Sequence, residues 1–430
     1  MRKLLYFSYF FPPMGGVAGL RALKFVKYLP HYNWQPHVIS VKRIAAPAYD
    51  DSLREQISGS AVFYTEAFTP MRFLYLFDRA SSLLSSSRSN YLRASEKKRF
   101  FWRNIFPIDS KIGWIPFAVH KSMTLGKKFE FSAVIATIPP YSAAVAAYRT
   151  AKKLSLPLIV DYRDLWQGNS EIPYSCQWLR KYSYEWEKKI LSYAAAVIMA
   201  TRSIRDQIMS FYPDIDDSKF YYIPNGWDSE DFQGLQSRCT SEISFTFIGS
   251  LSGEIVPHSF MKALQEMEAE GRLPNVKFRF IGSFSDEIKE ILQVNNLVDR
   301  VEVLSHQPHR QALEYMLGST FLLLFLPRLR AGFAIPAKVF EYLAARRPIL
   351  AMIPENSEAA AILKENKVAL LADFNDIPAI KENIYTAITL AKQGNIDREF
   401  SLQDNLINQF ERKNLTRELG SILDKIIDEN

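Results

Sequence analysis

Residues 4–21 read LLYFSYFFPPMGGVAGLR, and this stretch decides the fold class. Its apolar part, Leu4–Phe10, predicts a buried strand that the following prolines and glycines end. From Val17 to Leu29 the apolar residues recur at helical spacing with basic residues between them, which predicts an amphipathic helix. A strand, a tight turn and a helix in this order form the repeating unit of a parallel α/β sheet.

The same unit recurs in two series. The first has helices at Ser142–Leu154 and Trp178–Leu191, and its further strands are Pro36–Val41, Ala133–Thr137, Leu158–Asp161, Ala195–Ala200 and Phe220–Ile223. The second follows a polar stretch, Ser229–Glu242, and its strands are Ser244–Ile248, Val276–Ile281, Val301–Leu304, Thr320–Phe325, Ile349–Met352 and Val368–Leu371. Strands that alternate with helices predict parallel sheets covered on both faces.

Two series of similar size predict an α/β protein with two Rossmann-like domains facing a central cleft. We place the domains at 1–230 and 231–430. The last helix, Arg412–Ile427, has no strand of the second domain left to cover, so it can cross back to the first domain.

Length and composition agree with this organisation. The 430 residues exceed one ordinary domain of roughly 100–200 residues. The net charge of +7 suits anionic ligands or anionic lipid better than a dedicated nucleic-acid binder. Two cysteines, Cys176 and Cys239, make no disulfide scaffold and favour a reducing compartment. No run of about 18 apolar residues predicts a membrane-spanning helix, so we expect a cytoplasmic protein.

One segment, from Phe73 to Trp114, interrupts the alternation with interleaved basic and aromatic residues. Such a mixture suits the headgroup layer of an anionic membrane, which would make the protein peripheral to the inner face of the cytoplasmic membrane. The alternative is a solvated excursion whose aromatic residues pack on the domain. The candidate membrane-contact residues are Arg93, Lys97, Lys98, Arg99, Phe100, Phe101, Trp102 and Arg103.

Several enzyme classes lack their motifs here. The chain has no Walker A sequence, no Gly-x-Gly-x-x-Gly after a strand, no Gly-x-Ser-x-Gly elbow and no His-Glu-x-x-His. Its six histidines have no metal-ligand spacing on a helix. The triplet Asp214-Ile215-Asp216 formally matches a metal-binding Asp-x-Asp, but it lies where a turn is expected. We therefore predict no metal site and no cofactor.

Polar residues follow two strands of the first series at their carboxyl ends, where open α/β sheets bind ligands. Gly15 and Gly16 precede the first helix, and Arg21 lies just inside it. Asp161, Arg163 and Asp164 follow a buried strand, so they either pair with one another or meet a polar ligand.

The second series contains the segment 332–348, GFAIPAKVFEYLAARRP. Pro336 suits a helix start, and Arg347-Pro348 suits its end. Lys338 and Glu341 are three residues apart, hence on one face near the helix N-terminus. Together they can offer a cation to phosphate and an acceptor to sugar hydroxyls, or they form a surface ion pair.

Taken together, these segments resemble a GT-B glycosyltransferase of glycosyltransferase family 4, of the kind found in bacterial surface-polysaccharide assembly. The resemblance covers nearly the whole chain. It is carried by the Phe-Pro-Pro-x-Gly-Gly turn at 11–16, Thr137–Pro140, Asp161–Trp166, Ile223–Gly226 and Pro336–Leu350.

The resemblance implies a retaining, metal-independent enzyme that binds a nucleotide-diphosphate sugar in the C-terminal domain and a saccharide or lipid-linked acceptor in the N-terminal domain. Glu341 matches the second glutamate of the family's Glu-x7-Glu motif, which usually lies at the nucleotide ribose. The implied donor-binding residues are Gly249, Ser250, Gln307, Pro336, Lys338 and Glu341. The implied acceptor or cleft residues are Gly15, Gly16, Arg21, Arg163 and Asn225, and the catalytic candidates are Lys338, Glu341, Asp161 and Asp164.

Two positions depart from the family pattern. Phe333 stands eight residues before Glu341, where the motif has its first glutamate. The segment 249–254, GSLSGE, has neither the Arg nor the Lys that often binds pyrophosphate. We therefore expect the backbone N–H groups of Gly249 and Ser250, with Lys338, to take over that role.

Two other functions keep the same fold. One is a sugar-nucleotide epimerase, which would need several acid/base groups at one sugar carbon. The other is a non-catalytic, membrane-docked assembly partner, which the two departures would permit.

Overall fold

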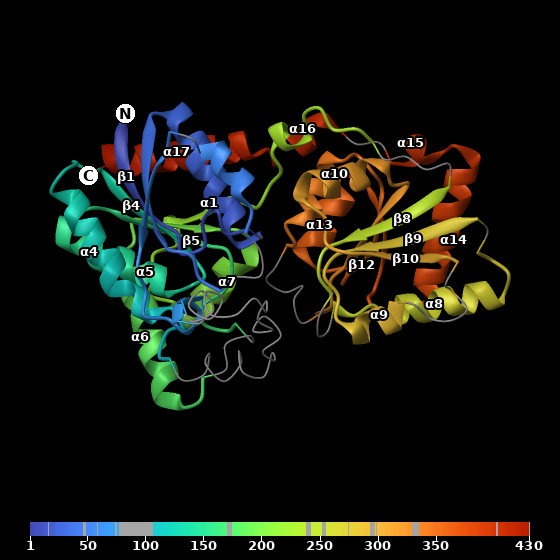
Figure 1. The fold of residues 1–430 in the computed structure, drawn as a ribbon, viewed down its shortest axis with the longest axis horizontal. Coiled ribbons are helices and arrows are strands. Elements are labelled where there is room, and N and C mark those ends of the chain that lie inside the picture. The colour runs from blue at the N-terminus through green and yellow to red at the C-terminus, as the bar shows by residue number, and fades with distance from the viewer. Residues whose placement is uncertain are drawn as a thin grey trace, which may run out of the picture. The chain divides into compact units, whose positions relative to one another are not determined.

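The computed structural model describes residues 1–15, 17–45, 49–57, 59–73, 75–76, 106–169, 174–237, 242–251, 255–273, 275–292, 297, 299–328, 335–400 and 403–429. The chain divides into two compact units (Figure 1). The first unit comprises Met1–Pro224 and Arg412–Asn430, and the second comprises Asn225–Glu411. The predicted membrane-contact residues between Arg93 and Arg103 lie outside the described residues.

The first unit is built on a parallel sheet of seven strands in the order β3-β2-β1-β4-β5-β6-β7. The strands are β1 (Arg2–Phe7), β2 (Trp34–Val41), β3 (Ala61–Thr65), β4 (Ala133–Ile138), β5 (Leu158–Tyr162), β6 (Ala196–Met199) and β7 (Phe220–Tyr222). Its helices are α1 (Val17–Tyr28), α4 (Ile115–Gly126), α5 (Ser142–Leu154), α6 (Gln177–Tyr193), α7 (Arg202–Phe211) and α17 (Arg412–Asp428).

The last helix returns to the first unit, as predicted. Leu415, Leu419 and Leu423 of α17 are buried with Leu23 and Val26 of α1 in one hydrophobic cluster. Figure 1 shows α17, in red, beside the blue strands and helix that begin the chain. We placed the second domain at 231–430, but the second unit ends at Glu411 because α17 completes the core of the first.

The second unit has a parallel sheet of six strands in the order β10-β9-β8-β11-β12-β13. The strands are β8 (Ile243–Ile248), β9 (Val276–Ile281), β10 (Val301–Leu304), β11 (Phe321–Phe325), β12 (Ile349–Met352) and β13 (Ala369–Ala372). The helices are α8 (His258–Ala269), α9 (Asp286–Leu292), α10 (His309–Gly318), α12 (Lys338–Ala344), α13 (Glu358–Glu365), α14 (Ile377–Gln393), α15 (Ile396–Glu399) and α16 (Asp404–Asn408).

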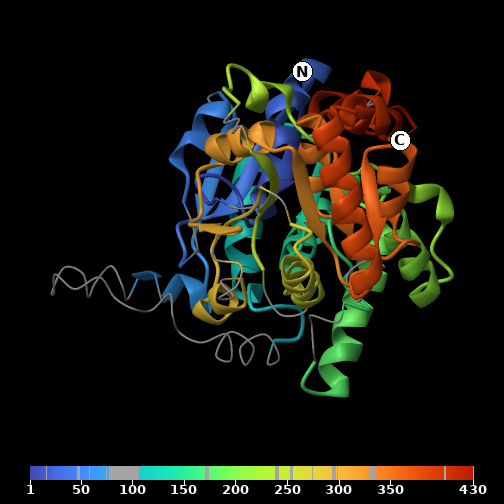
Figure 2. The same ribbon diagram turned by 90° about the vertical axis from the view of Figure 1, so that its right-hand side faces the viewer.

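Alternate side chains of these strands point to opposite faces of the sheet, and each face has its own core. Phe321 and Leu323 pack in a cluster with α8, α9 and α14, whereas Leu322 and Leu324 pack with α10, α12 and α13. Figure 2 shows the helices of this unit on both faces of its sheet. The predicted α/β class with two parallel sheets is confirmed.

Candidate functional site

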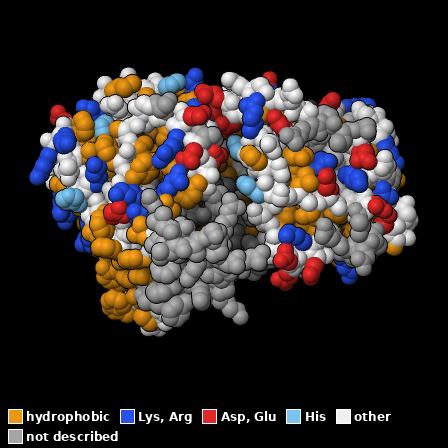
Figure 3. Space-filling model, viewed as in Figure 1, with side chains coloured by type: hydrophobic (Ala, Val, Ile, Leu, Met, Phe, Trp, Pro, Cys, Tyr) orange, Lys and Arg blue, Asp and Glu red, His pale blue; other side chains and the backbone are white. Residues whose placement is uncertain are grey.

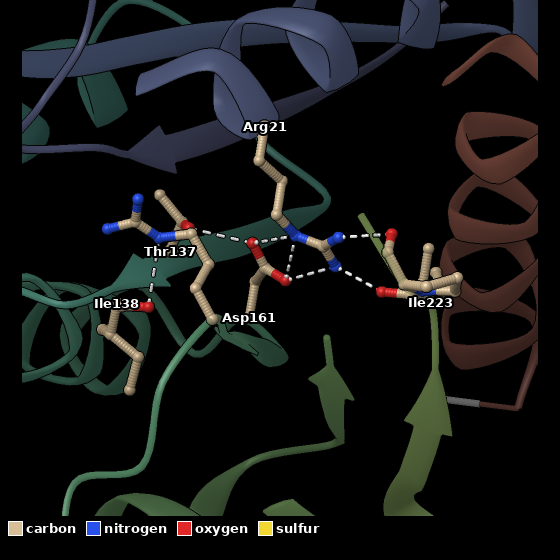
Figure 4. A network of polar contacts seen from close by, with 7 residues as sticks. Arg21, Thr137, Ile138, Asp161 and Ile223 are labelled. Atoms are coloured by element: carbon tan, nitrogen blue, oxygen red, sulfur yellow. Dashed lines mark hydrogen bonds and ion pairs between the residues drawn. The ribbon is translucent and has the colours of Figure 1, made fainter. Parts of the chain in front are cut away.

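A buried ion pair joins α1 to the carboxyl end of β5. The Nε of Arg21 donates to both carboxylate oxygens of Asp161, at 3.0 and 3.1 Å, and Nη2 donates to Oδ1 at 2.8 Å. The hydroxyl of Thr137 donates to Oδ2 at 2.8 Å. Side-chain exposure is 1% for Arg21 and 3% for Asp161, so solvent screens the pair little (Figure 4).

The same guanidinium also fixes the end of the first unit. Its Nη1 donates to the carbonyl oxygen of Pro224 at 2.7 Å, and its Nη2 donates to that of Ile223 at 2.8 Å. The Arg21 guanidinium therefore donates hydrogen bonds both to the Asp161 carboxylate and to two backbone carbonyl oxygens that follow β7. The assignment of Asp161 as a catalytic residue and of Arg21 as an acceptor residue is not supported, because both are enclosed and already partnered.

Arg163 does not pair with Asp161 in this network. Its Nε donates to the carbonyl oxygen of Ile138 at 3.2 Å, and its Nη2 donates to that of Pro139. Burial lowers the pKa of the Arg163 guanidinium, and Asp164 and then Asp161 raise it.

Asp164 and Gly15 are half-buried, and Gly16 lies outside the described residues.

A second buried carboxylate in the first unit was not anticipated. Glu187 on α6 is 1% exposed and accepts hydrogen bonds from the hydroxyls of Tyr162, at 3.0 Å, and Tyr212, at 2.9 Å. The amide of Gln167 donates to it at 3.1 Å. Burial raises the Glu187 pKa to about 7, although these three donors lower it.

In the second unit, two of the predicted donor residues, Gly249 and Lys338, meet at the carboxyl end of β8. The repeated Ile-Gly-Ser segments lie side by side, since Ile248 pairs with Ile281. A Cβ on Gly282 would lie 1.9 Å from the Gly249 carbonyl oxygen, so only glycine fits there. Gly249 has φ 143°, a conformation that favours glycine.

The side chain of Lys338 reaches this backbone from the start of α12. Its ammonium lies 4.0 Å from the ring centroid of Phe247, and only 2.6 Å from where a Cβ of Gly249 would be. Among the described residues we find no carboxylate or hydrogen-bond acceptor in contact with it. Burial lowers the Lys338 pKa to about 8, and the charge of Glu341 raises it. A buried ammonium without an anionic partner among the described residues is suited to bind an anion.

Glu341 lies one turn further along α12, and it has a partner that the sequence did not reveal. The Nε2 of His309, the first residue of α10, lies 3.0 Å from Oε1 of Glu341. The two side chains are 34% and 23% exposed, so a ligand can reach both. Helix α10 follows β10 and helix α12 follows β11. Because all strands of the sheet are parallel, both helices begin at the carboxyl ends of the strands, where His309 and Glu341 meet.

The backbone contributes less than we expected. The amide of Gly249 donates to the carbonyl oxygen of Ile281 at 2.9 Å, so it is not a free donor for pyrophosphate. The amide of Val339 donates to the carbonyl oxygen of Pro336 at 3.0 Å, and the amide of Phe340 donates to that of Ala337 at 3.2 Å. The helix begins at Lys338 and not at Pro336. Lys338 is therefore the residue of this set that best fits the expected anion-binding role.

The remaining predicted donor and cleft residues differ in how exposed they are. Ser250 is exposed, and Pro336 is half-buried. The amide of Gln307 donates to the carbonyl oxygen of Ser305 at 2.9 Å. Asn225 is half-buried and begins the second unit. Phe333 lies outside the described residues.

A cavity of about 740 Å³ also opens in the second unit, at the ends of β12 and β13. Its polar lining includes Arg328, which is held by Asp373 at 3.0 Å, and Ser357 and Asp376, which cap helices. None of the predicted site residues lines it.

We searched the part of the chain that the structure describes for metal-ligand groups and for helices that could span a membrane. No group of three or more His, Cys, Asp or Glu side chains there could hold a metal ion. No helix there is both long enough and apolar enough to cross a membrane.

Solved structures define the class of this fold. A glycosyltransferase from Rickettsia africae superimposes with a TM-score of 0.68 at 13% identity, covering 100% of this chain and 99% of that one. Sucrose-phosphate synthase from Thermosynechococcus elongatus gives 0.67 at 12% identity, covering 100% of both chains. Anabaena HepE, solved with UDP and glucose, gives 0.66 at 13% identity, covering 99% of this chain and 100% of that one. The fold is that of GT-B glycosyltransferases.

The sequence comparison identifies the family. Residues 15–231, just over half of the chain, match the model of Glycosyltransferase Family 4. The chain belongs to this family and is a glycosyltransferase. A comparison with curated protein sequences gave no match.

Proposed function

We propose that the protein is a retaining, metal-independent glycosyltransferase that transfers a sugar from a nucleotide-diphosphate sugar to a saccharide or lipid-linked saccharide in surface-polysaccharide biosynthesis. The observation that carries this proposal is the half-enclosed ammonium of Lys338 beside the backbone of Gly249, one helical turn from Glu341. The structures of HepE with UDP and with UDP-glucose support a donor of this kind on a shared fold.

In this proposal the second unit binds the donor. Lys338 contacts the diphosphate, and Glu341 accepts hydrogen bonds from the ribose hydroxyls. His309 fixes the Glu341 carboxylate through the 3.0 Å contact between Nε2 and Oε1. The family often has an Arg or a Lys directly after the first strand of this domain, but residues 249–254 include neither. In this proposal Lys338, on α12, supplies the cation instead.

The reaction breaks the bond between the anomeric carbon and the diphosphate oxygen, and the acceptor hydroxyl forms a new bond to that carbon on the same face. The hydroxyl proton passes to the departing diphosphate, which leaves as the nucleoside diphosphate. The developing phosphate charge is stabilised by Lys338, since a preorganised cation in a half-buried site stabilises charge better than water does. A divalent cation is not required for this step in our proposal.

The first unit would bind the acceptor. Asp164, half-buried after β5, remains the candidate to orient the acceptor hydroxyl, whereas Asp161 is committed to Arg21. A lipid-linked acceptor would place the enzyme at the inner face of the cytoplasmic membrane.

The proposal is tested by incubating the protein with UDP-, GDP-, ADP- and dTDP-sugars in EDTA, with and without a lipid-linked acceptor extract. We expect release of one nucleoside diphosphate that rises with acceptor and is lost in Lys338→Met and Glu341→Gln. Lys262→Met, an exposed lysine on α8, is the matched control and should be fully active. Conversion of one nucleotide-sugar into another without acceptor would instead indicate an epimerase. Absence of any turnover or hydrolysis would contradict the proposal.

A further inference from the structure

One exposed side of α6 carries a ladder of aromatic rings. Trp178 is 65% exposed and stacks on Tyr182 with ring centroids 5.6 Å apart. Tyr182 in turn contacts Trp186 at 6.4 Å. The three residues are spaced by four, which places them along one side of the helix. Figure 3 shows hydrophobic side chains gathered over this end of the first unit.

Helix α5 extends the ladder. The ring of Tyr148 lies 6.0 Å from Trp186 and 5.3 Å from Tyr193, the last residue of α6. From Trp178 to Tyr193 the ladder is about 22 Å long at a rise of 1.5 Å per residue. Figures 1 and 2 show α6, in green, with one end reaching beyond the helices around it.

Cations line this ladder. The guanidinium of Arg149 lies 5.3 Å from the Trp186 ring, and the Lys189 ammonium lies 5.5 Å from the same ring and 5.9 Å from Tyr148. Lys152 and Lys181 are exposed nearby on the same two helices.

None of these four cations forms an ion pair in the part of the chain that the structure describes, although the exposed Glu185 is on α6. On these two helices the four cations thus exceed the one exposed carboxylate, Glu185, and of the rings beside them Trp178 and Tyr193 are exposed whereas Tyr148 is buried. We call the five rings and four cations the α5–α6 face.

The fold uses only part of this face, since Tyr148 is 6% exposed and packs α5 against α6, whereas Trp178 is 65% exposed. The core side of α6 is formed by Leu179, Ser183, Glu187, Ile190 and Leu191. An exposed tryptophan leaves a large apolar area in water, and a surface that combines such rings with unpaired cations indicates a binding site.

We propose that the α5–α6 face docks on an anionic lipid bilayer, with Trp178 and Tyr182 inserted at the headgroup level and the cations paired with lipid phosphates. Tryptophan and tyrosine prefer this layer, and basic residues are attracted to anionic lipid. A second copy of the chain would bring like charge against like. A single-stranded nucleic acid would favour a groove, whereas this ladder lies on an exposed helix.

The inference goes beyond the proposed function because it names the surface that docks. It rests on the proposed function only for the reason to dock, which is access to a lipid-linked acceptor. Vesicle binding is measured without donor or acceptor, so failure of the two proposals can be told apart.

The test is co-sedimentation of the full chain with phosphatidylglycerol-containing and pure phosphatidylcholine vesicles. We expect strong preference for the anionic vesicles, which salt weakens. Each cation near an anionic surface contributes about fivefold to partitioning, so Arg149→Gln/Lys152→Gln/Lys189→Gln should weaken binding on the order of 100-fold. Trp178→Ala/Tyr182→Ala should weaken it at least tenfold at every salt concentration.

The matched control uses the same chemistry elsewhere. Tyr385, 46% exposed in the second unit, lies 4.9 Å from the guanidinium of Arg272, and Tyr385→Ala/Arg272→Gln should bind vesicles like the wild type. Cys176 is exposed two residues before Trp178, so an environment-sensitive dye on it, in a Cys239→Ser background, should shift to the blue on anionic vesicles.

Equal binding to both vesicle types would overturn the inference, as would wild-type binding by both α5–α6 face variants. Preferential binding to single-stranded oligonucleotides, or self-association that the tryptophan variant abolishes, would assign the face to another partner and also overturn it.

Discussion

Replacing Asp161 by Asn tests whether the Arg21–Asp161 pair is structural. The variant keeps the shape of the side chain and an acceptor for Thr137, but it leaves the Arg21 cation buried with only the carbonyl oxygens of Ile223 and Pro224 and the amide oxygen as acceptors. Breaking a buried pair on one side costs about 3–5 kcal/mol, because the remaining charge is uncompensated.

For a unit of this size, each kcal/mol corresponds to about 2–4 °C in Tm, so Asp161→Asn should lower the melting temperature of the first unit by about 6–20 °C. Differential scanning calorimetry measures this change. Asp217 supplies the control: it accepts from Arg205 at 2.6 Å, but the two side chains are 53% and 42% exposed. Asp217→Asn should therefore cost less than about 1 kcal/mol.

An activity assay distinguishes a structural role of Asp161 from a catalytic one. At a temperature where the variant is fully folded, Asp161→Asn should transfer sugar at close to the wild-type rate. The double variant Arg21→Met/Asp161→Leu should recover part of the lost stability, because no unpaired charge then remains, although the carbonyl oxygens of Ile223 and Pro224 lose their donor. An Asp161→Asn protein that melts like the wild type, or that is stable and inactive, would refute the structural role.

Three further predictions concern the two units. Glu187, with a folded pKa of about 7 against an ordinary 4.5, favours the folded state below pH 4.5 and loses this contribution as the pH rises through 7. Glu187→Gln should thus be more stable than the wild type by about 3 kcal/mol at pH 8, with the two proteins converging at pH 4; a difference independent of pH in urea unfolding would contradict this. Gly249→Ala should strain a backbone at φ 143° and displace the Lys338 ammonium, so that nucleotide affinity falls about tenfold in calorimetric titration; unchanged affinity would argue against Lys338 as the anion-binding group. His309→Ala should raise the donor KM with little change in kcat, because it frees the Glu341 carboxylate without removing it; a loss confined to kcat would place His309 in the chemical step.

Much of the fold could be predicted because its signal is local. Val276–Ile281 and Ile349–Met352 have the predicted bounds, because the first alternates apolar and basic residues at strand spacing and the second is a short apolar run. The return of α17 could be predicted because the second domain had no strand left for this helix to cover. β3, with the sequence AVFYT, was missed because it is a half-buried edge strand next to an irregular segment.

The candidate site was only partly predictable, since partners far apart in the sequence decide each side chain's role. Asp161 could have paired with Arg163, two residues away, yet the fold brings Arg21 to it from 140 residues away. His309 follows a proline after a strand, and only the topology places it beside Glu341. The spacing of Lys338 and Glu341 was informative because one helix carries both.

The central claim is that Lys338 binds the diphosphate of a nucleotide donor, and calorimetric titration of UDP, GDP, ADP and dTDP in EDTA at pH 7 tests it most directly. We predict that one nucleoside diphosphate binds, that its monophosphate binds less tightly, and that Lys338→Met weakens the diphosphate about 10- to 100-fold. The wild-type affinity should also fall above pH 8, as the ammonium with a pKa of about 8 loses its proton. Binding that is equally tight for the monophosphate, or unchanged in Lys338→Met, would contradict the claim.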